Sequence, residues 1–277
     1  MTETNDLILW ETKDHVTTLT LNNPRKLNGW TMDMLDALGA ALKRAANDAD
    51  TKVLILTGAD PYYCAGVNLS AVISPGHPAK LHAFIVEQNQ GLFEMFLNFP
   101  KPIMVAVNGP AIGASVTSAT LCDAIIASES ATFSTPFAKL GVTPEGCSSV
   151  LLPKLVGEDA ARRMLGPEGW QPTGSEAAEI GLVDQVVAHE NLLEEASELA
   201  KQWICDGRKR SFKASMSLDE LRKINARESQ ELADAFLGPK FLRGQYEFLK
   251  SKGKTGPALV FRSILLSRPL WKRLLPK

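Results

Sequence analysis

The sequence predicts an α/β protein, on three observations. Apolar runs rich in β-branched residues, such as Val53–Leu56 and Ile103–Val107, are typical of buried strands. Between them, residues 80–98 carry apolar side chains at helical spacing. The segment Gly113–Cys122 is small and apolar throughout, as in a buried helix. Strands that alternate with helices ordinarily form a doubly wound parallel sheet.

The N-terminal part predicts a hairpin followed by a helix. Residues 7–12 and 16–22 alternate as strands do, with a turn at 13–15. A loop follows, and Thr31 can cap the next helix. Apolar residues of that helix recur at i, i+3 and i+7, namely Leu35, Leu38 and Leu42. We therefore expect this helix to pack on a sheet.

The remaining elements follow from similar local signals. Residues 68–73 begin a short helix, and 74–78 form the clearest loop. Further along the chain we expect strands at 124–127, 131–134 and 182–187, helices at 146–156 and 158–165, and a capping box at 173–176. From residue 190 onward the pattern is helical. We expect a core over 1–200 and a helical region over 201–277.

Composition excludes several classes of protein. The chain has 277 residues and a net charge of −1, which argues against a nucleic-acid-binding protein. No apolar run approaches the roughly 18 residues of a membrane span. Its four cysteines lack metal-ligand spacing, so we expect neither a metal site nor disulfides. The acidic, polar start is unlike a signal or transit peptide, and we expect a cytoplasmic protein.

Two strand–helix junctions and one carboxylate suggest a catalytic site. The runs 63–69 and 111–115 place small residues where a strand gives way to a helix, so that a ligand can approach the backbone. Two backbone N–H groups that converge on one oxygen form an oxyanion hole. Glu145 stands alone among Val142, Pro144 and Cys147, where a carboxyl group can have a raised pKa and act as a base. Its other interpretation is a surface carboxylate.

The segment Ser134–Ser149, together with these junctions, resembles the crotonase (enoyl-CoA hydratase/isomerase) superfamily, with the Δ3,Δ2-enoyl-CoA isomerase branch as the most similar part. The resemblance implies a crotonase-like spiral of ββα units in place of a doubly wound sheet. It also implies that the C-terminal helical region closes the site and builds a homotrimer or a dimer of trimers.

The resemblance assigns an acyl-CoA substrate and the residues that bind it. The N–H groups of Ala65 and Ala114 would hold the thioester oxygen, and Glu145 would be catalytic. The residues that match binding positions are Lys26, Leu27, Ala65, Gly66, Val67, Asn68, Leu69, Ala114 and Phe137. Phe84, Phe96, Phe137 and Leu140 are candidates for the acyl tunnel. Coenzyme A is part of the substrate, so no separate cofactor is expected. The basic turn 208–210 either meets CoA phosphates or is simply solvated.

The resemblance also indicates the reaction. Family hydratases use two glutamates, and those positions are Thr117 and Phe137 in this chain. The isomerase branch uses one glutamate, which Glu145 matches, and one carboxylate is enough for a 1,3 proton transfer. We therefore expect a Δ3,Δ2-enoyl-CoA isomerase of fatty-acid metabolism. Two alternatives stay open: another crotonase-fold enzyme (a weak hydratase or one for substituted acyl-CoA), and a non-catalytic CoA-binding module.

Overall fold

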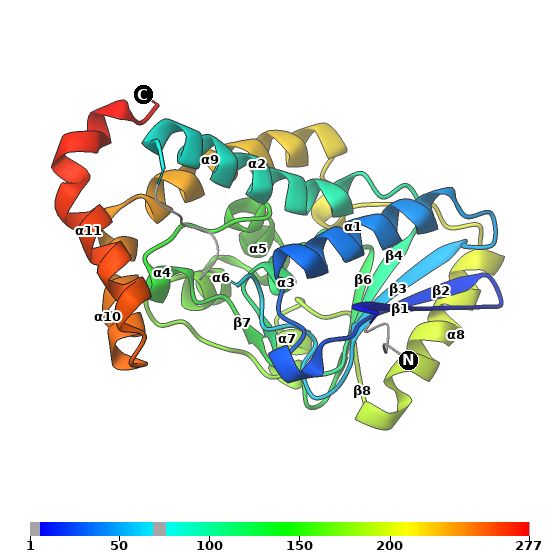
Figure 1. Cartoon of the computed structure of the whole chain (residues 1–277). Coiled ribbons are helices and arrows are strands. Elements are labelled where there is room, and N and C mark those ends of the chain that lie inside the picture. The colour runs from blue at the N-terminus through cyan, green and yellow to red at the C-terminus, as the bar shows by residue number, and fades with distance from the viewer. Residues whose placement is uncertain (1–5, 69–75, 277) are drawn as a thin grey trace, which may run out of the picture.

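The computed structural model describes residues 6–68 and 76–276. Its strands are β1 (Ile8–Lys13), β2 (Val16–Leu21), β3 (Val53–Gly58), β4 (Ile103–Val107), β5 (Ala111–Ile112), β6 (Ala124–Ser128), β7 (Phe133–Ser134) and β8 (Gln185–Val187). Its α-helices are α1 (Met32–Asn47), α2 (Pro78–Leu97), α3 (Ala114–Ala119), α4 (Phe137–Leu140), α5 (Ser148–Val156), α6 (Glu158–Leu165), α7 (Gly174–Glu179), α8 (Leu192–Cys205), α9 (Leu218–Phe236), α10 (Pro239–Ser251) and α11 (Thr255–Trp271). Figure 1 shows their arrangement.

The main sheet has six strands in the order β1-β2-β3-β4-β6-β8, and only the β1–β2 pair is antiparallel. Its central strands are buried on both faces. Alternate side chains point to opposite faces of a strand. Accordingly, Leu54 and Leu56 belong to the same apolar cluster as helix α1, whereas Val53 and Ile55 belong to the cluster that contains Ala196 of α8. The sheet therefore lies between two helical layers (Figure 1).

A repeated unit of two strands and a helix generates the rest of the core. Strand β4 is followed by the short strand β5 and helix α3, and β6 is followed by β7 and α4. The second strands pair with each other in parallel, in a small sheet separate from the main one. Cys64, which follows β3, forms a parallel bridge with Ala111 and extends this arrangement. The expected spiral of ββα units is therefore confirmed, in place of a doubly wound sheet.

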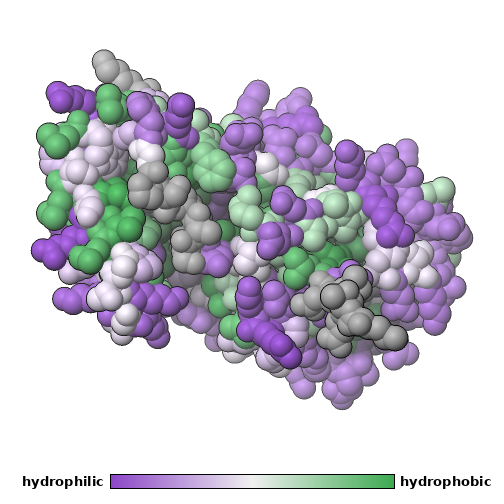
Figure 2. All heavy atoms as spheres, in the orientation of Figure 1, coloured by the Kyte–Doolittle hydropathy of each residue, from purple (hydrophilic) through white to green (hydrophobic). Residues whose placement is uncertain are grey.

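The C-terminal helices cover one end of the core. Helix α9 packs along α2, and α10 packs on α11. One apolar cluster joins side chains of α2 to those of α9, α10 and α11, including Ile85, Leu232, Phe241 and Phe261. Figure 2 shows apolar side chains at the end of the molecule formed by α10 and α11. The large exposed ones there are Phe248, Leu259, Leu266 and Leu270.

Most local expectations are confirmed. The hairpin forms, the Thr31 hydroxyl accepts the N–H of Met34, and the capping box that starts at Thr173 has both of its hydrogen bonds. The last strand is shorter than predicted, because the N–H groups of Leu182 and Val183 donate to the Ala177 carbonyl oxygen of α7 before β8 begins. The expected helix at 68–73 falls largely, and the loop at 74–78 partly, outside the described residues. The division at residue 200 stays a prediction.

Two kinds of feature are absent from the described residues. No helix in that part of the chain is both long and apolar enough to cross a membrane. No group of three or more histidine, cysteine or acidic side chains in residues 6–68 and 76–276 could hold a metal ion.

Candidate active site

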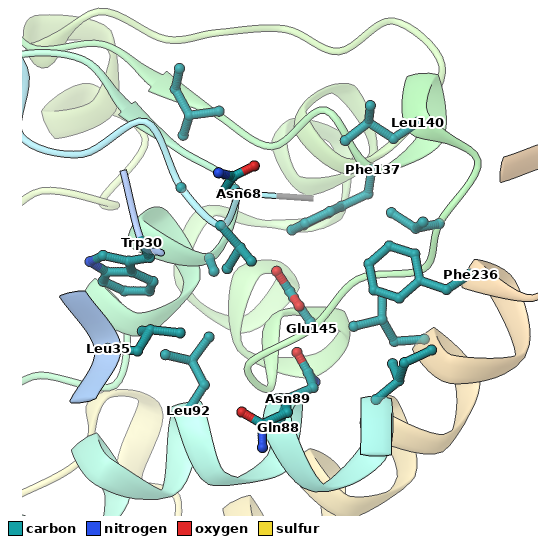
Figure 3. Close-up of a pocket in the computed structure, with 18 of the residues that line it drawn as sticks. Trp30, Leu35, Asn68, Gln88, Asn89, Leu92, Phe137, Leu140, Glu145 and Phe236 are labelled. Atoms are coloured by element: carbon teal, nitrogen blue, oxygen red, sulfur yellow. The ribbon is translucent and has the colours of Figure 1, made fainter. Parts of the chain in front are cut away.

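A cavity of about 300 Å³ opens between the core and helix α9. Its walls come from the ends of the repeated units, from α2 and from α9, and they are mostly apolar (Figure 3). The apolar side chains include Trp30, Leu35, Phe84, Ile85, Leu92, Phe137, Leu140, Val142, Leu232 and Phe236. An apolar cavity with a few polar groups is the usual form of a small-molecule site.

Glu145 projects into the middle of this cavity (Figure 3). It lies in the loop between α4 and α5, and its own carbonyl oxygen accepts the Ser148 N–H at 3.2 Å and the Ser148 hydroxyl at 2.6 Å. The next residue, Gly146, has φ +66°, and a Cβ atom there would lie 2.3 Å from a ring carbon of Phe93. Only glycine fits this turn, so local sequence and packing together fix where Glu145 points.

The surroundings of Glu145 favour its neutral form. The residue is only 8% exposed, and no described residue donates a hydrogen bond to its carboxyl oxygens. Burial raises the pKa of Glu145 to about 8, and the negative charge of Glu228 contributes to the increase. Near neutral pH roughly a tenth of the molecules therefore carry Glu145 as a carboxylate, and that carboxylate is a stronger base than an exposed one.

The two strand–helix junctions meet at the cavity. Cys64 and Ala111 form a parallel bridge, and the N–H of Ile112 donates to the Cys64 carbonyl oxygen at 3.0 Å. A Cβ atom on Gly66 would lie 2.4 Å from the Ile112 carbonyl oxygen, so the close approach requires glycine there. Val67 and Ala114, which each follow the bridge by the same number of residues, both line the cavity.

One of the predicted oxyanion-hole donors is wrong. The N–H of Ala65 donates to the carbonyl oxygen of Leu27 at 2.9 Å, so it is not free for a substrate. The carbonyl oxygen of Gly66 accepts the N–H of Trp30, and the N–H of Asn68 donates to the carbonyl oxygen of Trp30. Alternate N–H groups of an extended segment point in opposite directions. The N–H of Val67 thus points away from Trp30 and has no acceptor among the described residues.

The second predicted donor has a free N–H group. Ala114 is the first residue of α3, where a backbone N–H lacks a partner within the helix. No acceptor for it is present in the described part of the chain, whereas the N–H of its neighbour Gly113 is bound to Ser134. Ala114 and Val67 both line the cavity, and each has an N–H group without an acceptor among the described residues.

The other predicted binding residues divide into three groups. Ala65, Gly66, Val67, Asn68 and Phe137 all line the cavity. Lys26 and Leu27 do not: they lie at a short helical turn behind Ala65, and both are exposed. Leu69 lies outside the described residues.

The structure bears on three further expectations from the sequence. Of the acyl-tunnel candidates, Phe84, Phe137 and Leu140 line the cavity, but Phe96 is fully buried and stacks on Trp30 at 6.3 Å. Thr117 is buried, and its hydroxyl donates to the Ala114 carbonyl oxygen. The guanidinium group of Arg210 is not free for phosphates, since it forms a buried ion pair with Asp123 at 2.8 Å.

Sequence reasoning missed three polar residues. Gln88 and Asn89 of α2 line the cavity below Glu145 (Figure 3). Glu228 of α9 is fully buried behind the Glu145 loop. A signal for Glu228 was present: it stands seven residues after Leu221 and four before Leu232, on the apolar stripe of an amphipathic helix. A carboxylate on such a stripe is unusual and calls for a partner.

Comparisons with known proteins agree with this geometry. Residues 11–251 match the enoyl-CoA hydratase/isomerase family. Human enoyl-CoA delta isomerase 2 is 34% identical over 261 residues, 87% of this chain and 63% of that protein. The 1,2-epoxyphenylacetyl-CoA isomerase of Escherichia coli K12 is 38% identical over 199 residues, 71% of this chain and 75% of that protein.

A solved structure supports the fold. An enoyl-CoA hydratase from Mycobacterium avium subsp. paratuberculosis superposes with a TM-score of 0.73 at 25% identity, over 88% of this chain and 96% of that one. The match to the family extends over most of the sequence and includes both junctions and Glu145. The chain therefore belongs to the enoyl-CoA hydratase/isomerase family and has the crotonase fold.

Proposed function

We propose that this protein is a Δ3,Δ2-enoyl-CoA isomerase that moves the double bond of a 3-enoyl-CoA into conjugation with the thioester. The observation that carries the proposal is Glu145, the carboxylate side chain that projects into the apolar cavity. Two relatives are named as isomerases, one of enoyl-CoA and one of an epoxidised phenylacetyl-CoA.

The geometry supports a proton transfer by one base. Glu145 takes a proton from C2 of the substrate, and the negative charge spreads to the thioester oxygen. The N–H groups of Val67 and Ala114 hold that oxygen, and a single donor of this kind typically contributes about 2.7–4 kcal/mol to the transition state. The protonated Glu145 then returns the proton at C4. The apolar side chains Phe137 and Phe236 keep water from the dienolate.

The same residues disfavour hydration. Addition of water requires a group that positions and activates the water molecule, and family hydratases use two glutamates for it. In this chain Phe137 adds an apolar ring to the cavity, and the hydroxyl of Thr117 is bonded within its own helix. The non-catalytic module is disfavoured as well, because a protein that only binds CoA gains nothing from a buried carboxyl group.

A second candidate reaction is isomerisation of an acyl-CoA that carries a polar substituent. Asn89 supports it: its amide nitrogen donates to Ser229 at 3.0 Å, while its oxygen has no partner among the described residues and points toward Glu145 (Figure 3). Such an oxygen can accept a hydrogen bond from a hydroxyl on the acyl group. A panel of plain and hydroxylated 3-enoyl-CoA substrates distinguishes the two.

The central test follows the absorbance of the conjugated thioester as 3-enoyl-CoA is converted to 2-enoyl-CoA. We expect rapid isomerisation and little hydration of 2-enoyl-CoA. Glu145→Gln should lower kcat by roughly 10²–10⁴, the usual contribution of a positioned base. The matched control is Glu129→Gln, which replaces an exposed carboxylate that does not line the cavity. Isomerisation unchanged in Glu145→Gln would refute the assigned role.

We also propose that the protein assembles as a homotrimer or a dimer of trimers. Support comes from the exposed apolar side chains of α10 and α11, such as Leu266 (70% exposed) and Leu270 (69%). Apolar surface of this kind is typical of association surfaces. Light scattering coupled to size exclusion tests it: a monomer at micromolar concentration would contradict the proposal.

A further inference from the structure

A second buried carboxylate lies directly behind the loop that carries Glu145. Glu228, on α9, is 0% exposed. One of its oxygens accepts the N–H of Cys147 at 2.7 Å, and the other accepts the N–H of Ser149 at 3.0 Å and its hydroxyl at 2.5 Å. A buried charge is tolerated only when hydrogen bonds or ion pairs compensate it, and these three donors serve that purpose.

These donors belong to the first turn of helix α5 and the residue before it. Cys147 occupies the N-cap position in a left-handed conformation, with φ +66°, and its side chain caps nothing. The first turn of α5 contains no acidic residue of its own. Free N–H groups at a helix N-terminus require an acceptor, and Glu228 supplies it from a helix about 80 residues further along the chain. Glu145 lies two residues before Cys147, so α9 holds the loop of the base.

The charged groups around Glu228 offset its negative charge only in part. Its charged neighbours are Glu145 and Arg227, and the thiol of Cys147 also faces it. Arg227 is half-exposed; it donates to the Ser149 hydroxyl at 2.9 Å and lies 3.6 Å from Glu231, so it offsets the charge of Glu228 only in part.

Hydrogen bonding gives the two carboxyl groups different pKa values. Burial raises the pKa of Glu228 to about 7, while the donors from Ser149 and Cys147 act in the opposite direction because they favour the charged form. Glu145 receives no hydrogen bond from a described residue, and its pKa is higher. Glu228 therefore ionises first, and its charge acts on Glu145, whose proton it helps to retain.

We propose that Glu228 is a positioning residue for the proton transfer: its carboxylate ties the Glu145 loop to α9, and its negative charge increases the basicity of Glu145. The inference rests on the proposed function only in that Glu145 is the base. The C2 proton of a thioester is weakly acidic, so a more basic carboxylate removes it faster. A neutral residue at 228 could cap α5, but it could not supply the charge.

The first test is an NMR titration that requires no turnover. The carboxyl carbon of Glu145 is observed in protein labelled with ¹³C-glutamate and assigned by its loss in Glu145→Gln. In Glu228→Gln we expect the titration midpoint of Glu145 to fall by about one pH unit. The matched control, Asp219→Asn, removes an exposed carboxylate from the same helix that is paired with Arg222 rather than Arg227, and it should leave the midpoint unchanged. An unchanged midpoint in Glu228→Gln overturns the proposal.

Glu228→Asp provides a second variant should the glutamine variant fail to fold. It keeps the charge but shortens the side chain by one methylene. We expect the Glu145 midpoint to stay within a few tenths of a unit of the parent value, with a lower kcat because the loop is held less firmly. A midpoint in Glu228→Asp that falls by a full unit overturns the charge role, since the charge is still present.

Kinetics separate this inference from the proposed function. In Glu228→Gln the acidic limb of the kcat/KM profile for 3-enoyl-CoA should move to lower pH by the same amount as the NMR midpoint. If Glu228→Gln changed only the stability of the protein, its kcat/KM profile would have the same acidic limb as the parent. This result would overturn the proposal. If the parent protein does not turn over 3-enoyl-CoA, the proposed function fails, while the titration still decides whether Glu228 controls Glu145.

Discussion

Replacing Glu145 with glutamine is expected to stabilise the folded protein, and the gain should grow with pH. Burial gives Glu145 a pKa of about 8, against an ordinary value of 4.5 that it recovers on unfolding. Between these values the folded protein binds a proton that the unfolded chain has released. The free energy of unfolding of the parent therefore falls as pH rises from 4.5 toward 8. Glutamine is neutral at every pH, so the free energy of unfolding of the variant does not fall for this reason.

The size of the effect follows from the difference between the two pKa values. One pKa unit corresponds to about 1.4 kcal/mol, so the variant should gain under about 1 kcal/mol at pH 5, about 3 kcal/mol at pH 7 and about 4 kcal/mol at pH 8. Glu228 also has a raised pKa, but it is present in both proteins, and to first order its contribution cancels in the difference.

Urea unfolding of both proteins at pH 5, 7 and 8 measures this difference. The protein concentration must be equal in all experiments, because association would add to the apparent stability. Glu129→Gln serves as the control for replacing an exposed carboxylate, and its effect at pH 7 and 8 should be smaller than that of Glu145→Gln. A gain that is constant with pH, or largest at pH 5, would show that Glu145 is solvated in the folded protein, and the argument for a strong base would fail with it.

Three further outcomes are expected. In steady-state kinetics, kcat/KM for 3-enoyl-CoA should rise tenfold per pH unit and level off above about pH 8, since Glu145 must be unprotonated to act; a flat profile from pH 6 to 9 would contradict this. Arg210→Met leaves the buried carboxylate of Asp123 without its ion-pair partner and should lower the free energy of unfolding by about 3–5 kcal/mol in urea titrations. Gly146→Ala forces a Cβ atom against Phe93, so both kcat and thermal stability should fall, and retention of both would show that the turn relaxes freely.

Local signals in the sequence predicted most of the elements. The alternation in 7–22, the apolar run Ile103–Val107 and the capping box at Thr173 each depend on neighbouring residues, and each appears as expected. The spiral arrangement was not visible in the pattern, because periodicity does not show that β5 and β7 leave the main sheet and pair with each other. The resemblance to a family supplied that information.

The site was also predicted only in part, because some of its features depend on contacts between distant parts of the chain. Glu145 stands in a short segment of apolar and turn-forming residues, so its burial could be inferred locally. Ala65 was wrongly assigned as a donor because the direction of an N–H group depends on the path of the backbone, and Leu27 takes that bond. Glu228 lies 83 positions after Glu145, and only the packing of α9 brings its carboxylate to Cys147.

The packing of α9 also has a consequence for synthesis of the protein. The chain is made from its N-terminus, and residues 6–187 contain every strand in the described part of the structure as well as Glu145. The carboxylate that anchors the loop of Glu145 is added only after another 40 residues. A nascent chain can therefore complete its sheet and still lack the bonds that hold its base in place. Catalytic competence would appear late, when the last quarter of the chain folds back onto what was made first.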